Sequence, residues 1–117
     1  MAISKNHSKY RAVKTVVNGI TFSSKKEAKR YNILLAQQQA GEISSLQLQP
    51  IFELQEGFKM GKRKISAIKY IADFSYQRAD TGAVVVEDVK GMKTRVYSLK
   101  KKMFLKKYGE MYEFMEV

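Results

Sequence analysis

Residues 83–91 read AVVVEDVKG, and this stretch decides how the rest of the chain is arranged. Ala83–Val86 is apolar on both faces, which is typical of a strand in the centre of a sheet. A carboxylate at the end of such a strand, Asp88, is costly to bury unless it is paired or bound to a cation. Because strand side chains alternate, Asp88 and Lys90 share one face, about 7 Å apart, while Glu87 points to the other. We therefore expect a central strand that ends in charged side chains.

The segments on either side of this strand predict a mixed α and β structure. Thr15–Phe22 indicates a hairpin, because its Asn-Gly dipeptide accepts the positive φ angles of a type I′ turn. Further strands are predicted at Leu46–Leu54, at Ile68–Tyr76 and at Tyr112–Val117. The first of these is at an edge or is broken, because Pro50 cannot donate to a ladder. Residues 56–64 are predicted to be a polar loop.

Two helices complete the predicted fold. One runs from Ser23 or Ser24 to about Ala40, and the other from Lys93 to Tyr108, and a glycine follows each. The second is predicted to bury a stripe of four side chains, Val96, Leu99, Met103 and Phe104. The order of elements predicts an α/β (α+β) fold: one domain over residues 1–117, with a central mixed β-sheet flanked by two helices.

The charge of the chain points to a polyanionic partner. Its 117 residues carry a net charge of +11, and each Lys or Arg placed on a phosphate releases condensed counterions. The basic residues gather near the N-terminus and in the second predicted helix, and residues 1–13 are predicted to form a basic flexible arm. The side chains expected to bind nucleic acid are Lys5, Lys9, Arg11, Lys25, Lys26, Lys93, Arg95, Lys100 and Lys101. Solubility or binding to anionic lipid is the alternative explanation of the charge.

Composition also excludes several kinds of site. The chain has no cysteine, which excludes disulfides, thiolate metal sites and cysteine nucleophiles. Its only histidine, His7, lies in the predicted arm, so neither a histidine-based triad nor a zinc site is expected. There is no apolar run that resembles a signal peptide or a membrane span. We therefore expect a cytoplasmic protein, in the cytoplasm of the host cell if a phage encodes it.

Two aspartates are the best candidates for chemistry. Asp73 interrupts an apolar strand and Asp88 ends the most apolar one. Two carboxylates on adjacent strands suit Mg²⁺, or Mn²⁺ in its place, because these hard cations also keep waters and take phosphate oxygens. Lys90 can then orient an attacking water or stabilise developing negative charge. Plain ion pairs, of Asp88 with Lys90 and of Asp73 with a lysine across strands, explain the same residues equally well.

Glu27 has two interpretations that are hard to combine. Ser24-Lys25-Lys26-Glu27 fits a capping box, in which the glutamate reaches back to the start of its own helix. A glutamate one turn into the first helix can instead point at the sheet and at a metal bound there. The sequence alone favours the capping box.

The chain resembles the PD-(D/E)XK nuclease superfamily, which includes archaeal Holliday-junction resolvases, many restriction endonucleases and the nuclease subunit of some transposases. More narrowly, it is similar to small phage and prophage proteins long described without a function. The stretches that carry the likeness are residues 6–10 (NHSKY), 22–28 (FSSKKEA), 49–50 (QP), 70–74 (YIADF) and 87–94 (EDVKGMKT). The chain departs from the motif at Ala72, where the superfamily is named for a proline, and at Glu87, whose role a shift of register could exchange with that of Asp88.

The resemblance implies a metal-dependent DNA endonuclease. It implies that Asp73 and Asp88 are metal ligands, that Lys90 is the catalytic lysine, and that Glu27 is a catalytic carboxylate that binds the metal directly or through water. The expected substrate is branched DNA such as a Holliday junction in phage recombination, and resolvase relatives imply a homodimer. Two alternatives stay open: a non-enzymatic DNA-binding phage accessory protein on the same fold, and a nicking or end-cutting nuclease that works with a partner subunit. The sequence does not distinguish DNA from RNA.

Overall fold

The structure is a computed structural model that describes residues 13–91 and 93–117. Apart from Val13, the basic arm predicted for residues 1–13 lies outside the described residues. The described chain forms one small α+β domain with two helices and a mixed sheet, as predicted. No helix of this part of the chain is long and apolar enough to span a membrane.

The central sheet has four strands in the order β10-β9-β8-β3. β9 (Val84–Asp88) lies inside it, parallel to β10 (Glu113–Glu116) and antiparallel to β8 (Phe74–Arg78). β3 (Ile43–Leu48) pairs with the far edge of β8 in antiparallel orientation. The apolar run at residues 83–86 was therefore correctly interpreted as the start of a central strand in a mixed sheet.

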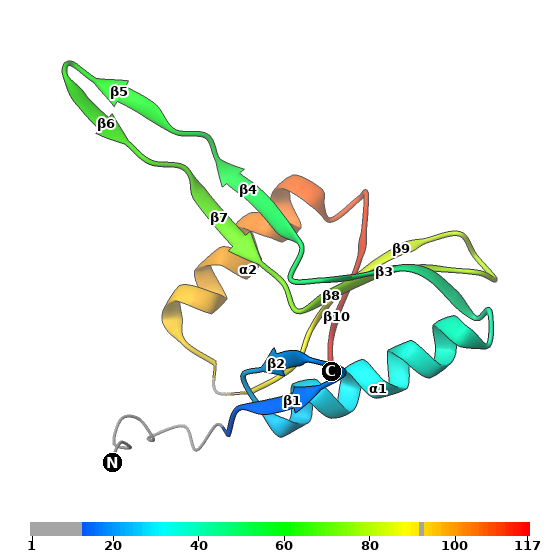
Figure 1. Cartoon of the computed structure of the whole chain (residues 1–117). Helices are drawn as coiled ribbons and strands as arrows, with labels where there is room; N and C mark the ends of the chain where they lie inside the picture. The colour runs from blue at the N-terminus through cyan, green and yellow to red at the C-terminus, as the bar shows by residue number, and fades with distance from the viewer. Residues whose placement is uncertain (1–12, 92) are drawn as a thin grey trace, which may run out of the picture.

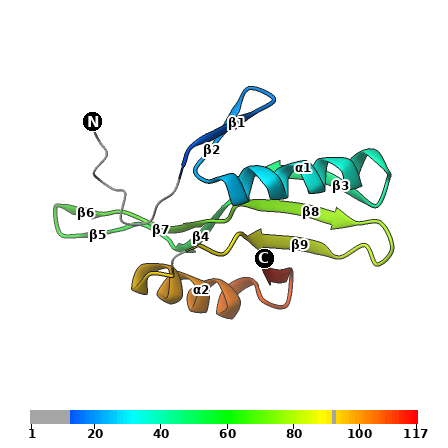
Figure 2. The same cartoon turned by 90° about the horizontal axis from the view of Figure 1, so that it is seen from below.

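The two helices lie on opposite faces of this sheet (Figure 2). α1 (Lys25–Gln39) packs Ala28, Tyr31 and Leu34 against one face, together with Val85 of β9. α2 (Arg95–Tyr108) packs Phe104 against the other face, together with Val86. Neighbouring residues of β9 thus belong to different clusters, because side chains of a strand alternate between its two faces.

The predicted buried stripe of α2 was partly wrong. Val96 is 62% exposed and Leu99 is 60% exposed. The helix instead presents Tyr97, Phe104 and Tyr108 to the sheet, with Met103 partly buried beside them. The side that faces the core is therefore rotated from the one predicted, because aromatic rings from neighbouring strands pack around Phe104.

β1 (Thr15–Val17) and β2 (Ile20–Phe22) form the predicted hairpin. Asn18 and Gly19, at its turn, have φ angles of 52° and 77°, as a type I′ turn requires. Phe22, at the end of β2, packs on Tyr31 with ring centroids 5.1 Å apart. The hairpin therefore leads directly into α1 and fixes where that helix begins.

Both long predicted strands are broken, and their outer halves leave the sheet as an arm (Figure 1). β4 (Ile51–Gln55) follows β3 after Pro50, and β7 (Ile68–Ile71) precedes β8. β4 and β7 pair with each other in a separate two-stranded sheet. The chain turns out of the central sheet at Gln49, whose φ angle is 51°, and at Ala72-Asp73 opposite it.

The arm ends in a second hairpin, β5 (Phe58–Met60) and β6 (Arg63–Ile65). The prediction of a polar loop over residues 56–64 was therefore wrong. Gly61 has a φ angle of 61° at the first of two turn positions, which is the position that a type II′ hairpin gives to glycine. The high charge of this segment conceals the alternation that would otherwise indicate strands.

Candidate functional site

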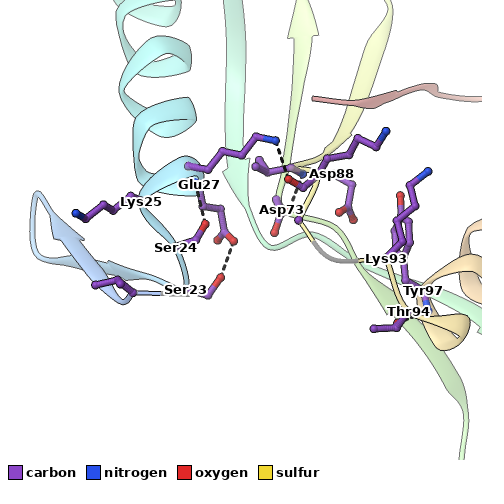
Figure 3. Close-up of a pocket in the computed structure, with 14 residues that line it drawn as sticks. Ser23, Ser24, Lys25, Glu27, Asp73, Asp88, Lys93, Thr94 and Tyr97 are labelled. Atoms are coloured by element: carbon purple, nitrogen blue, oxygen red, sulfur yellow. Dashed lines mark hydrogen bonds between the residues drawn. The ribbon is translucent and has the colours of Figure 1, made fainter. Parts of the chain in front are cut away.

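A cleft of about 710 Å³ opens where the start of α1, the end of β9 and the start of α2 meet. Its lining includes Glu27, Asp73, Asp88 and Lys90, the four residues that the sequence proposed for catalysis. In Figure 3, Glu27 enters from α1, Asp88 from the end of β9 and Asp73 from the bend between β7 and β8, and Tyr97 lies on the side of α2. Residues far apart in the sequence are thus brought to one surface.

Asp73 is held at the point where the arm leaves the sheet. Its backbone carbonyl accepts from Gln49 N at 2.9 Å, and its backbone N–H donates to Glu87 O at 3.0 Å. Its side-chain Oδ2 accepts from Val89 N at 2.6 Å. The break between β7 and β8 therefore turns this carboxylate toward the end of β9, where Asp88 lies.

Asp88 is the last residue of β9 and is held by a tyrosine. The hydroxyl of Tyr70, a buried residue of β7, donates to Asp88 Oδ2. Beyond Asp88 the chain stays beside the last strand, because Val117 N donates to Asp88 O at 2.9 Å and Lys90 N donates to Val117 O at 2.7 Å. These bonds fix the path of the chain between Asp88 and Lys90.

The backbone N–H of Glu27 takes part in the N-cap of α1, and its side chain lines the cleft. Ser24 is the N-cap of α1, and its side chain accepts from Glu27 N at 3.1 Å. The carboxylate does not complete a capping box; it accepts from Ser23 Oγ at 2.6 Å. The capping box that the sequence favours is therefore only half formed: Ser24 caps the helix, but the Glu27 carboxylate does not reach back to the Ser24 backbone and lies in the cleft instead.

The adjoining glutamate, Glu87, lies on the opposite face of β9. It is 0% exposed and accepts two hydrogen bonds from Arg30, at 2.8 Å and 2.6 Å, and a third from the Tyr76 hydroxyl. This buried ion pair ties α1 to the sheet. Glu87 does not line the cleft, so the alternation of faces along β9 correctly separates its surroundings from those of Asp88.

The aspartates of the cleft carry raised pKa values. Burial raises the pKa of Asp73 to about 7, and the charges of Asp88 and Glu27 add to this while the Val89 N–H opposes it. Burial also raises the pKa of Asp88, against the hydrogen bond from Tyr70, with further repulsion from Glu116 and Glu27. Within residues 13–91 and 93–117, no Lys or Arg forms an ion pair with Glu27, Asp73 or Asp88. The ion pairs expected as an alternative for the two aspartates are therefore not formed there.

The donor set fits a hard divalent cation that is only partly held by protein. In the part of the chain that the structure describes, no three His, Cys, Asp or Glu side chains form a group that could hold a metal ion by themselves. Mg²⁺ is commonly bound through one or two carboxylates, with waters and substrate phosphates completing its octahedron. Two partly buried aspartates without a basic partner meet that requirement.

The predicted nucleic-acid-binding residues are divided by the structure. Lys25, Lys26 and Lys93 line the cleft, and Lys26 Nζ donates to Lys90 O at 2.7 Å. Lys93 and Lys101 also form ion pairs with Glu116, at 3.6 Å and 3.1 Å. Arg95 and Lys100 are on α2 away from the lining, and three predicted residues lie outside the described part of the chain: Lys5, Lys9 and Arg11.

Sequence reasoning missed the hydroxyl groups around the site. Tyr70 fits an apolar strand face, and no feature of its sequence context indicates that its hydroxyl bonds Asp88. Tyr97, in the first turn of α2, lines the cleft and donates to Glu116 Oε2 at 2.5 Å. Thr94, the N-cap of α2, could have been found, because a threonine before an amphipathic run is a typical helix start.

Comparison with known proteins places the chain in a family without assigning it an activity. The family model described as "Protein of unknown function (DUF1064)" matches residues 7–115, so the chain belongs to that family. No curated protein and no solved structure gives a significant match to it.

Proposed function

We propose that this protein is a metal-dependent endonuclease of the PD-(D/E)XK type that hydrolyses phosphodiester bonds in DNA, with branched DNA as its substrate and the cytoplasm as its place of action. One observation carries the proposal: Asp73 and Asp88 meet Lys90 in one cleft and have no basic side chain paired to them among the described residues. Burying carboxylates together without a cation is costly, and this favours a site that is completed by one.

Asp73 and Asp88 would hold the metal, with Glu27 bound to it directly or through water. When bound, Mg²⁺ or Mn²⁺ lowers the pKa of a coordinated water and offsets charge on the phosphate. The protein's own part is to fix the ligands: Val89 N–H holds Asp73, the Tyr70 hydroxyl holds Asp88, and Ser23 holds Glu27. Such outer partners commonly orient metal ligands.

Lys90 would act on the substrate rather than on the fold. Its side chain is exposed and lines the cleft, while its backbone is fixed by Val117 and by Lys26. An ammonium group there can orient the attacking water or stabilise the charge that develops on a phosphate. Lys25 and Lys26, on the rim of the same cleft, would hold the phosphate backbone.

The test is cleavage of a labelled four-way junction and of a matching linear duplex, each with Mg²⁺ or with EDTA. We expect the wild type to cut the junction only with Mg²⁺, and Asp88→Asn to fall to the level seen in EDTA. Asparagine can still accept from Tyr70, so the variant should keep the fold. Asp80→Asn, which removes an exposed turn carboxylate, is the matched control and should cut like the wild type. Equal cutting of both substrates would refute the selectivity for branched DNA and keep the nuclease.

A second candidate is a non-enzymatic DNA-binding protein on the same fold. It is favoured by the net charge of +11 and by Lys25, Lys26 and Lys93, which line the cleft and could bind phosphates without any cleavage. This candidate predicts that the wild type and Asp88→Asn bind the junction equally and that neither cuts it with Mg²⁺. That outcome would overturn the enzyme proposal.

Tyr70→Phe tests whether Asp88 needs its hydroxyl partner. The ring stays in its cluster beside Phe104, but Asp88 loses the hydrogen bond that favours its charged form. We expect a fall in apparent Mg²⁺ affinity of about 10- to 100-fold, as is usual when an outer partner of a metal ligand is lost. Cleavage measured over a range of Mg²⁺ concentrations would show it. Tyr112→Phe, whose ring belongs to the same cluster, is the control.

A further inference from the structure

The arm formed by β4–β7 and β5–β6 is the part of the fold that the cleft does not use. Figure 1 shows it projecting from the domain, beyond both helices. The radius of gyration of 16.5 Å is large for the chain length, since a compact domain of this size has about 13 Å. A two-stranded ribbon on its own is only marginally stable in water, so the arm adds little to the stability of the fold. We therefore ask what else it could bind.

The base of the arm is fixed and its end is free. Phe52 and Tyr70 belong to the cluster around Phe104, and the Tyr108 hydroxyl and Lys107 Nζ both donate to Glu53 O, at 2.7 Å and 3.0 Å. Within residues 13–91 and 93–117, no side-chain hydrogen bond or ion pair joins β5 or β6 to the rest of the chain. The arm is thus held at its base by α2, while the β5–β6 hairpin extends away from it (Figure 1).

The end of the arm combines positive charge with exposed apolar groups. Residues 58–65 read FKMGKRKI, with four basic residues and no acidic one. Phe58 is 45% exposed and Met60 is 64% exposed. Met60 is paired with Arg63, and Phe58 with Ile65, so these four side chains share one face of the ribbon, while Lys59 and Lys64 share the other.

We propose that the β5–β6 hairpin enters a groove of double-helical DNA, with its basic side chains on the phosphates and Met60 against the bases. The major groove of B-DNA is about 12 Å wide and admits a two-stranded ribbon. In proteins that bind the minor groove, apolar side chains press between base steps. Two copies of this hairpin would repel each other, so its charge favours DNA over a second copy of the chain as the occupant.

The place where the arm starts supports the same partner. β7 runs directly into Ala72 and Asp73, and Asp73 lines the cleft. Ala72 N donates to Pro50 O at 3.1 Å, so the two strands of the arm are joined at this point. A DNA duplex bound along the arm would therefore extend to the cleft that holds Asp73 and Asp88. The direction of the DNA rests on the proposed nuclease site, while the binding itself is argued from the charge and the exposed side chains of the arm.

The test is the salt dependence of binding to a fluorescent DNA duplex, measured by anisotropy in EDTA so that no cutting occurs. Lys62→Gln/Arg63→Gln removes two charges from the arm, and Lys102→Gln/Lys106→Gln removes two exposed charges from α2. A plot of the logarithm of the binding constant against the logarithm of the salt concentration has a negative slope. We expect this slope to be less steep by about 2 in the arm variant, because two phosphate contacts are lost. The α2 variant should keep the slope of the wild type.

Equal slopes in the arm variant and the wild type would overturn the inference, as would equal losses in the two variants. Binding of the arm to anionic phosphatidylserine vesicles with an unchanged DNA slope would assign it to a membrane surface instead and would also overturn it. A duplex containing 2-aminopurine checks the apolar tip: its fluorescence should rise with the wild type and not with Met60→Ala. Because this experiment measures binding and not cleavage, a negative result would overturn the role of the arm and leave the proposed nuclease untouched. Likewise, a failure of the cleavage test would not overturn DNA binding by the arm.

Discussion

Arg30→Met is expected to lower the free energy of unfolding by about 3 to 5 kcal/mol, the usual cost of removing one partner of a buried ion pair. Glu87 is 0% exposed, and Arg30 supplies two of its three hydrogen bonds. Methionine fills a similar volume but leaves the carboxylate buried with only the Tyr76 hydroxyl. Since Arg30 lies on α1 and Glu87 on β9, the loss would also loosen the contact of that helix with the sheet.

Arg78→Met is the matched control for this substitution. Arg78 makes the same two-pronged contact with Glu113, at 3.1 Å and 2.9 Å, but on an exposed surface. Surface pairs contribute about 0 to 1 kcal/mol, so this variant should unfold almost like the wild type. Urea unfolding followed by circular dichroism would compare the two. If Arg30→Met lost no more stability than Arg78→Met, the buried pair would not hold α1 to the sheet.

The sequence predicts the centre of this fold better than its edges. The apolar run ending in Asp88 has one place in a layered domain, inside the sheet, because it is apolar on both faces. The turn of the first hairpin and the start of α1 are equally well determined, by Asn18-Gly19 and by Ser24. In these places local preference and tertiary packing agree.

The arm could not be predicted in the same way. Apolar side chains recur at every second position from Ile68 to Tyr76, which predicts one continuous strand. The chain nevertheless leaves one sheet for another at Ala72-Asp73. Alternation records which residues share a face and does not record where a strand changes partner. Only Pro50, on the opposite strand, indicates the break.

The candidate site was predicted as a set of residues but not as an environment. Spacing along β9 separates Asp88 from Glu87, because one residue reverses the face. The partners of these carboxylates come from distant segments: Arg30 from α1, Tyr70 from β7 and Ser23 from the turn before α1. Such contacts depend on how the elements pack, which a pattern in one segment does not contain.

Asp73→Asn is expected to abolish Mg²⁺-dependent cutting and at the same time to stabilise the metal-free protein at pH 8. The pKa of Asp73 is raised to about 7, from 3.8, by burial and by the nearby carboxylates. A group whose pKa is higher in the folded state favours folding below about pH 4, and this contribution is lost as the pH rises toward 7. Above pH 7 the ionised side chain therefore weakens the metal-free fold.

Asparagine keeps an oxygen for Val89 N–H and carries no charge, so it removes that cost. We expect a gain of about 2 kcal/mol at pH 8 in EDTA, allowing for solvent screening of a partly exposed group, and no gain at pH 4. Mg²⁺ should stabilise the wild type but not the variant, because binding to the folded state alone adds to its stability. Urea unfolding at both pH values, with Asp80→Asn as control, would measure this. A variant less stable than the wild type at pH 8 would mean that Asp73 supports the fold, and the argument that its charge awaits a cation would fail.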